Sequence, residues 1–222
     1  MEYPGPARTD FHNVRSLNGE FLQWLGRRDV AAPPLKELPT NLAKRLAGLR
    51  LAERQRLAAT PFLLFSFRER DDDFWSRLLQ SSGTPDLLAA TAPSDDAELR
   101  IIAAGLGFVW QLARQNAYTA RLICGASLHW CEQLADKTLV DVMNVAAVSP
   151  NLLKLRVAGN RQLWHKLLNS GIQAEREVRH AAHISALQCV LTSAQRPHTV
   201  RPALAARAGL SPSRHVADRT GR

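Results

Sequence analysis

The pattern of apolar and polar positions predicts a mainly helical protein. Apolar side chains recur at helical spacing through residues 11–29, and two shorter helices are expected at 39–47 and 51–59. The run PFLLFSF differs, because it is short, opens on proline and alternates Phe65 with Phe67, so residues 62–67 predict a strand. The following DDDFWSRLLQ predicts a helix whose first turn is acidic, which favours the helix dipole.

The same order of elements is expected again after residue 96. Asp95 and Glu98 fit a capping box that opens a long helix ending near Cys124. The pattern then predicts helices at 127–135 and 139–147, a strand at 152–157, a helix at 160–169, and an additional helix from Gln173 to Ser193.

The two halves also match in sequence. Residues 61–79 align with 150–168 without a gap, which pairs Trp75 with Trp164. Self-similarity at a domain-sized period predicts two tandem homologous modules, so residues 38–80 are expected to overlay on 127–169. Strands this short cannot stand alone, and we expect the two strands to pair about a pseudo-two-fold axis.

This repeat sets the expected domain organisation. A linker rich in Ser, Pro and Thr, residues 81–96, separates the modules. The predicted units are a first module at 1–85, a second module at 86–194 with a long entry helix and an extra C-terminal helix, and a basic tail at 195–222.

Composition narrows the class of protein. The chain has 222 residues, of which 45% are hydrophobic, and no window approaches eighteen uninterrupted apolar residues. The N-terminus lacks the apolar stretch of a secretory signal, and three cysteines are typical of a reducing compartment. We therefore expect a cytoplasmic protein without a membrane-bound part.

The net charge of +9 is unevenly distributed. Residues 1–90 and 91–194 each contribute +2, whereas 195–222 contribute +5. Such a tail either aids solubility or makes an electrostatic contact to nucleic acid, where each cation displaces a condensed counterion. The second interpretation predicts DNA contacts from Arg196, Arg201, Arg207, Arg214 and Arg219.

The tail also contains a degenerate helix-turn-helix-like sequence, RPALAARAGLSPSRHVADR. Ser211 and Pro212 suit the N-cap and first position of a recognition helix. His215 and Asp218 occupy positions that should be apolar for packing, so a disordered basic segment is the alternative.

Metal and catalytic motifs are weak. Cys124, His129 and Cys131 lie close in sequence, with Cys189, His180 and His183 further on, but the spacings match no standard metal site. Small core residues are the favoured interpretation of the cysteines. There is no glycine-rich phosphate loop, nucleophile elbow or paired histidine and carboxylate, so no cofactor and no enzymatic activity are expected.

Two further features have a functional and a structural interpretation. Trp75 and Trp164 could stack on bases, but their apolar surroundings favour packing in each module. The acids 71–73 could suggest Mg²⁺, but their counterparts are Asn160, Arg161 and Gln162, which favours a solvated helix N-terminus.

Finally, part of the first module resembles FlhD, the D subunit of the bacterial flagellar master transcription activator. The resembling segment is LPTNLAKRLAGLRLAERQRLAATPFLLFSFR, and it is preceded by the helical LNGEFLQWLGRRD. The resemblance lies in a helix pair leading into a short aromatic strand. It implies a helical dimer that binds duplex DNA together with a zinc-bearing FlhC-like partner subunit, and here two modules in one chain would replace the dimer.

The sequence thus leads to two hypotheses. The first is a bacterial, cytoplasmic transcription regulator of the FlhD type that binds DNA, with a homo-oligomer left open. The second is a non-enzymatic protein-interaction adaptor without DNA binding. Affinity for duplex DNA measured against salt separates them, because phosphate contacts release counterions.

Overall fold

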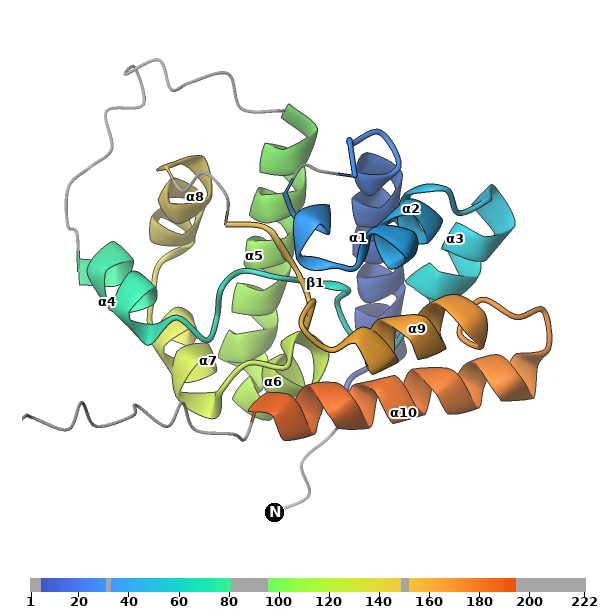
Figure 1. The fold of residues 1–222 in the computed structure, drawn as a ribbon. Coiled ribbons are helices and arrows are strands. Elements are labelled where there is room, and N and C mark those ends of the chain that lie inside the picture. The colour runs from blue at the N-terminus through green and yellow to red at the C-terminus, as the bar shows by residue number, and fades with distance from the viewer. Residues whose placement is uncertain (1–4, 31–32, 81–95, 149–151, 195–222) are drawn as a thin grey trace, which may run out of the picture.

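The structure is a computed structural model that describes residues 5–30, 33–80, 96–148 and 152–194. It is mainly helical, with two short strands (Figure 1). The elements of the first half are α1 (Arg8–Leu25), the 3-10 helix η1 (Leu35–Glu37), α2 (Thr40–Ala47), α3 (Leu51–Ala58), β1 (Phe65–Ser66) and α4 (Asp72–Gln80). Those of the second half are α5 (Asp96–Gln115), α6 (Ala117–Cys124), α7 (Leu128–Ala135), α8 (Leu139–Val148), β2 (Lys154–Leu155), α9 (Arg161–Asn169) and α10 (Arg176–Ala194).

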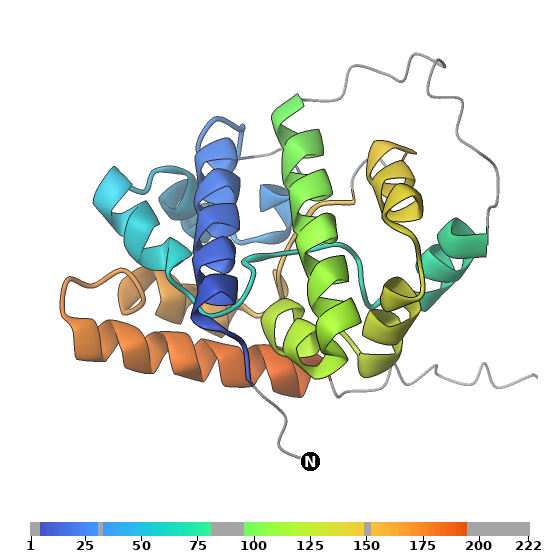
Figure 2. The same cartoon turned by 180° about the vertical axis from the view of Figure 1, so that it is seen from behind.

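The long helices α1 and α5 lie side by side in the middle of the molecule (Figures 1 and 2). Helices α2, α3 and α9 gather on the α1 side, and α4, α7 and α8 gather on the α5 side. Helix α10 crosses one end of the assembly and packs on α9. No helix in the described ranges is long and apolar enough to cross a membrane.

The two strands pair antiparallel, as predicted, in a two-stranded sheet. Phe65 lies opposite Leu155, and Ser66 lies opposite Lys154. In the sequence match, however, Phe65 corresponds to Lys154 and Ser66 to Leu155. Each residue therefore pairs with the counterpart of its neighbour, which is the register produced by a local two-fold axis between the strands.

Both strands are shorter than the predicted 62–67 and 152–157, because neighbouring backbone groups find partners outside the sheet. The Leu63 N–H donates to Ile123 O at 3.0 Å, and the Leu64 N–H donates to Asn18 Oδ1 at 2.8 Å. Beyond β1, the Phe67 N–H donates to the Glu69 carboxylate at 2.6 Å. These bonds satisfy the backbone without extending the ladder.

The turn from strand to helix has the same geometry in both halves. Arg68 and Val157, which correspond in the sequence match, both have positive φ, at 56° and 48°. Trp75 Nε1 donates to Phe67 O at 3.1 Å, and its counterpart Trp164 Nε1 donates to Arg156 O at 3.0 Å. Left-handed backbone is unusual for a β-branched residue such as Val157. The indole hydrogen bond closes this turn in each half.

The prediction of one helix from Asp95 to Cys124 is wrong. Helix α5 ends at Gln115, and α6 begins at Ala117 after Asn116 leaves helical geometry at φ −161°. The Asn116 side chain accepts from the Tyr118 and Thr119 N–H groups, so it caps a new helix. Asp95, half of the expected capping box, lies outside the described residues.

The antiparallel strands send the following helices to opposite sides. After β1 the chain leads to α4, where Trp75 packs edge-on against Trp130 of α7, with ring centroids 5.2 Å apart. After β2 it leads to α9, which contacts α2. Arg45 of α2 donates a hydrogen bond to Asn169 Oδ1 of α9. Each half thus covers part of the other, and the buried apolar side chains form one continuous core across both.

Two buried polar side chains secure the centre. Asn18 of α1 donates to Phe62 O at 2.9 Å and accepts from Leu64 N. Arg156 forms an ion pair with Glu69 at 2.7 Å, with 3% and 2% of the two side chains exposed. Its guanidinium also donates to the Leu63, Phe65 and Cys124 carbonyl oxygens. Burial of these groups is tolerated because each is hydrogen-bonded.

Candidate nucleic-acid interface

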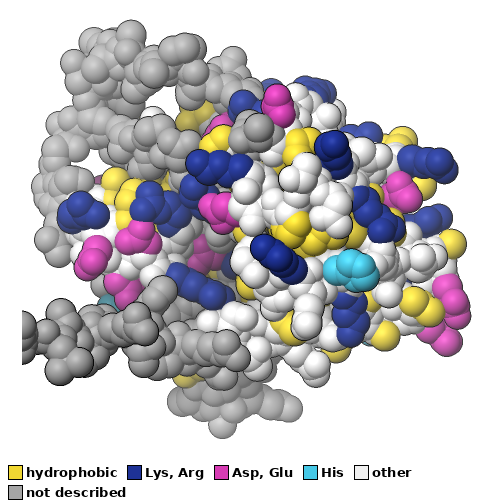
Figure 3. All heavy atoms as spheres, in the orientation of Figure 1, with side chains coloured by type: hydrophobic (Ala, Val, Ile, Leu, Met, Phe, Trp, Pro, Cys, Tyr) yellow, Lys and Arg dark blue, Asp and Glu magenta, His cyan; other side chains and the backbone are white. Residues whose placement is uncertain are grey.

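A concentration of positive charge lies on α2, α3, the turn between them, and α9. We call this surface the basic face. It carries seven cations and one acid, a formal charge of +6: Lys44, Arg45, Arg50, Arg54, Arg56, Arg161, Lys166 and Glu53. Figure 3 shows Lys and Arg side chains gathered over this side, with few acidic side chains among them.

The basic face is not neutralised by ion pairs. In the described ranges, none of its seven cations makes a salt bridge. The Glu53 carboxylate instead accepts from the backbone N–H of Arg50 at 2.8 Å, where it caps α3. An uncompensated group of cations keeps a positive potential that attracts anions.

Some of these cations are held in place by neutral groups. Arg56 donates to Ile172 O at 3.3 Å, and Lys166 donates to the Ser185 hydroxyl at 2.7 Å. Lys44, Arg50 and Arg161 are exposed. The face therefore combines anchored charges, which shape the surface, with exposed ones that can reach a ligand.

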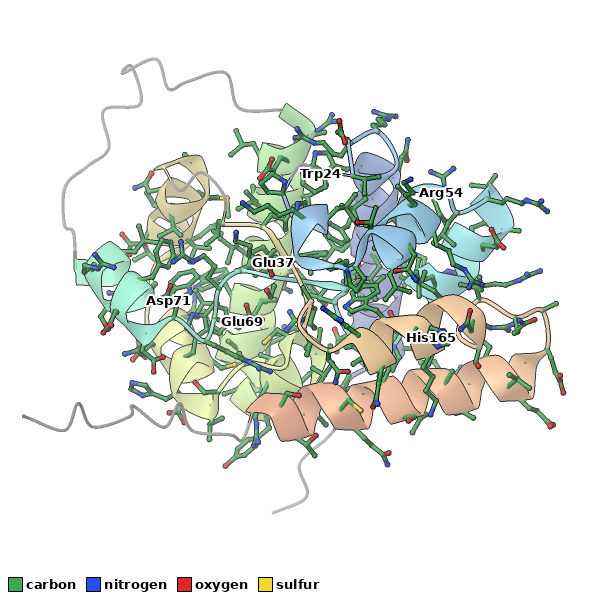
Figure 4. The ribbon with its side chains drawn as sticks, in the orientation of Figure 1. Trp24, Glu37, Arg54, Glu69, Asp71 and His165 are labelled. Carbon is green, nitrogen blue, oxygen red and sulfur yellow. The ribbon has the colours of Figure 1, made fainter. Side chains whose placement is uncertain are left out.

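A hollow of about 420 Å³ opens on this face, where the start of α2 meets the start of α9. It is lined by Pro39, Asn41, Leu42, Arg161, Gln162 and His165. Figure 4 shows His165 on α9 and Arg54 on α3, on the same side of the molecule. Arginine binds guanine edges, and asparagine and glutamine bind adenine edges, so the hollow carries residue types suited to base contacts as well as to phosphate.

The helices that correspond to α2, α3 and α9, each in the other half of the chain, are α7, α8 and α4, and they are acidic. Helices α7 and α8 with the turn between them contain Lys137 against three acids, a formal charge of −2. Helix α4 contains Arg77 against Asp72 and Asp73. The two halves thus repeat an order of elements but differ in charge, and of these two described groups of helices the basic face is the one that suits a polyanion.

The predicted DNA contacts in the tail, Arg196, Arg201, Arg207, Arg214 and Arg219, lie outside the described residues. So does the helix-turn-helix-like sequence at 201–219.

The two tryptophans pack in the core, as predicted. Trp75 and Trp164 are fully buried, so neither face of either indole is open to a base. Near Trp75, Asp71 caps α4 by accepting from the Phe74 N–H at 3.0 Å, as expected for a helix N-terminus. The hydrogen bond from Arg68 lowers the pKa of Asp71 below its ordinary value, which keeps this carboxylate charged.

The cysteine and histidine candidates do not converge on a metal site. Within the described residues, no group of three or more metal-ligating side chains lies together. Cys124 and Cys131 are buried side by side, and the Cys124 thiol together with burial raises the pKa of Cys131. Both thiols are buried among apolar side chains of the core, in agreement with the packing interpretation.

Comparison with known proteins adds no relative: no protein-family model, curated protein or solved structure matches the chain.

The basic face was missed in the sequence because its parts are far apart. Residues 40–58 carry +4, but the acids nearby reduce the total for residues 1–90 to +2. The remaining cations come from α9, which reaches α2 only through the antiparallel pairing of β1 and β2. A count of charges over each predicted helix would have found the cations of residues 40–58. It would not have shown that the cations of α9 lie beside them.

Proposed function

We propose that the protein is a bacterial, cytoplasmic transcription regulator that binds duplex DNA through the basic face. The observation that carries this proposal is the charge of +6 on three adjoining helices, none of whose seven cations forms an ion pair within the described residues. Cations in such a group exchange condensed counterions for phosphate contacts, which provides most of the affinity of DNA-binding proteins.

The resemblance of the helix pair and strand to FlhD supports the regulator part of the proposal. In that family two D subunits act together with an FlhC-like partner, and we propose a partner subunit here as well. The pseudo-two-fold register of β1 and β2 supports a chain that takes the place of a dimer. Transcription activation is the activity that the resemblance favours.

An experiment with paired variants tests the role of the basic face. Lys44→Ala/Arg161→Ala should weaken binding to a 20-base-pair DNA duplex, whatever the base sequence of the duplex. It should also reduce the slope of log K against log salt concentration by about 2, because two phosphate contacts are lost. Fluorescence anisotropy at several salt concentrations measures both quantities. Both residues are exposed, and neither side chain forms a hydrogen bond or ion pair within the described residues.

The matched control is Arg27→Ala/Arg100→Ala, which removes the same charge from exposed positions that line a hollow between α1 and α5 and do not belong to the three helices of the basic face. This control should retain most of the wild-type slope. Equal losses in the two double variants would mean that net charge, and not the basic face, determines binding.

A second prediction concerns the tail. A chain ending at Ala194 loses six arginines and one aspartate, so its formal net charge falls from +9 to +4. We expect weaker DNA binding and a flatter salt dependence, because fewer counterions are released. The melting temperature should change little, because few large apolar side chains are removed. Unchanged DNA affinity in the truncated chain would assign all binding to the described helices.

A protein-interaction adaptor is the second candidate. It is favoured by α8, where Leu139 and Val140 have 47% and 66% of their surface exposed. The equivalent helix α3 also exposes Leu51, at 66%, but four of its eight residues are polar, against two of ten in α8. Under this alternative, the full-length chain should show no useful DNA affinity at physiological salt, whereas the proposed regulator should bind and then lose affinity steeply as salt rises.

A further inference from the structure

A second site lies away from the basic face, where the start of α1 crosses α10. A groove of about 540 Å³ opens there, a volume within the range of small-molecule sites. One wall is a stripe of α1 formed by Arg8, Phe11, His12 and Arg15, which helical periodicity places on one face. The other wall comes from α10, and the segment 59–61 forms the floor.

The groove combines positive charge with apolar surface. None of its ten lining residues is acidic, and Arg8 and Arg15 make no ion pair within the described residues. The nearby Asp10 carboxylate is engaged by the Ala7 N–H at 2.8 Å. Two apolar side chains, Phe11 and Ile184, keep 37% and 38% of their surface exposed on the opposing walls.

The floor and inner wall are fixed and uncharged. The Thr60 hydroxyl donates to Phe62 O and accepts from the Asn18 side chain, so it is already satisfied. His183 is buried, and its Nε2 donates to Gly171 O at 2.9 Å. Burial lowers the pKa of His183, which keeps this imidazole neutral. The arginines therefore supply the charge, and the inner wall supplies a rigid surface for packing.

We propose that this groove binds a small organic anion with an apolar body. A carboxylate, sulfonate or phosphate group lies against Arg8 and Arg15, and the apolar body packs between Phe11 and Ile184. Guanidinium groups bind such anions by charge-assisted hydrogen bonds, and the apolar walls favour a ligand with a ring or short hydrocarbon chain over a fully hydrated inorganic ion. This site is independent of DNA binding by the basic face.

Two dyes with the same aromatic rings provide the test. The anion 1-anilinonaphthalene-8-sulfonate should bind the full-length chain with enhanced fluorescence, and neutral N-phenyl-1-naphthylamine should bind more weakly. Arg8→Ala/Arg15→Ala should raise the Kd of the sulfonate at least about tenfold, since each charge-assisted hydrogen bond contributes more than 1.4 kcal/mol. The same variant should leave binding of the neutral dye unchanged.

Two further variants keep the result interpretable. Phe11→Ala should weaken both dyes, because it removes apolar surface that they share. Lys44→Ala/Arg161→Ala, on the basic face, should weaken neither. Near-UV circular dichroism checks that each variant keeps native packing, because loosened proteins bind the sulfonate nonspecifically. No fluorescence enhancement with the wild-type chain, or equal sulfonate affinity in the arginine variant, would overturn the proposal.

Discussion

Replacing Glu69 by Gln is expected to lower the free energy of unfolding by about 3–5 kcal/mol, the range seen when one partner of a buried ion pair is removed. Glu69 and Arg156 are almost fully buried, and the glutamine would leave the guanidinium charge without its counter-ion. Figure 4 shows Glu69 inside the molecule, between the strand segment and the helices of the second half. Urea unfolding followed by circular dichroism measures the loss.

The control is Glu37→Gln. Glu37 pairs with Lys154 at 3.8 Å, but its side chain is 44% exposed, and an exposed pair contributes about 0–1 kcal/mol. The same chemical change should therefore have little effect there. If Glu69→Gln proves no more destabilising than Glu37→Gln, the buried pair does not hold the core together.

Arg156→Met should be at least as damaging as Glu69→Gln. It removes the donor for three carbonyl oxygens, those of Leu63, Phe65 and Cys124, and also isolates the Glu69 carboxylate. Unsatisfied buried groups cost about 1–3 kcal/mol each. Because Arg156 joins the ends of β1, β2 and α6, its loss should loosen the connection between the two halves.

Much of the fold could be predicted because the helical periodicity and the sequence match between the two halves indicated the same order of elements. The helical periodicity gave α2, α3, α7 and α9 nearly to the residue, and the pairing of the strands followed from their equivalence in the sequence. The break at Asn116 was missed because apolar spacing continues across it. A single capping side chain was enough to start a new helix there.

The buried polar groups could not be predicted in the same way. Arg156 corresponds to the apolar Phe67 in the sequence match, and an alternating Lys and Arg in a strand normally indicates a solvated face. Its partner Glu69 and three carbonyl oxygens come together only after the strands pair. The basic face has the same origin, because α9 reaches α2 across the sheet. Both features depend on contacts between distant segments, which periodicity does not report.

Asn18→Ala is expected to destabilise the protein by about 3–5 kcal/mol, because more than one buried group would lose its partner at a cost of about 1–3 kcal/mol each. Asn18 is fully buried in α1, where its amide nitrogen donates to Phe62 O and its oxygen accepts from Leu64 N. The substitution would also leave a cavity. Urea unfolding gives the free energy, and hydrogen exchange should show lost protection of the Leu64 amide.

Two comparisons separate hydrogen bonding from packing. Asn18→Asp keeps the size and the acceptor for Leu64 N, but it removes the donor and places a carboxylate oxygen against the Phe62 carbonyl, so it should also be strongly destabilising. Asn13→Ala, at an exposed position of the same helix, should change stability by no more than about 0.5 kcal/mol. If Asn18→Asp is tolerated as well as Asn13→Ala, Asn18 only fills space. If it is not, the segment leading into β1 depends on an amide from α1 that both donates and accepts, just as the Leu63 and Phe65 carbonyl oxygens depend on Arg156.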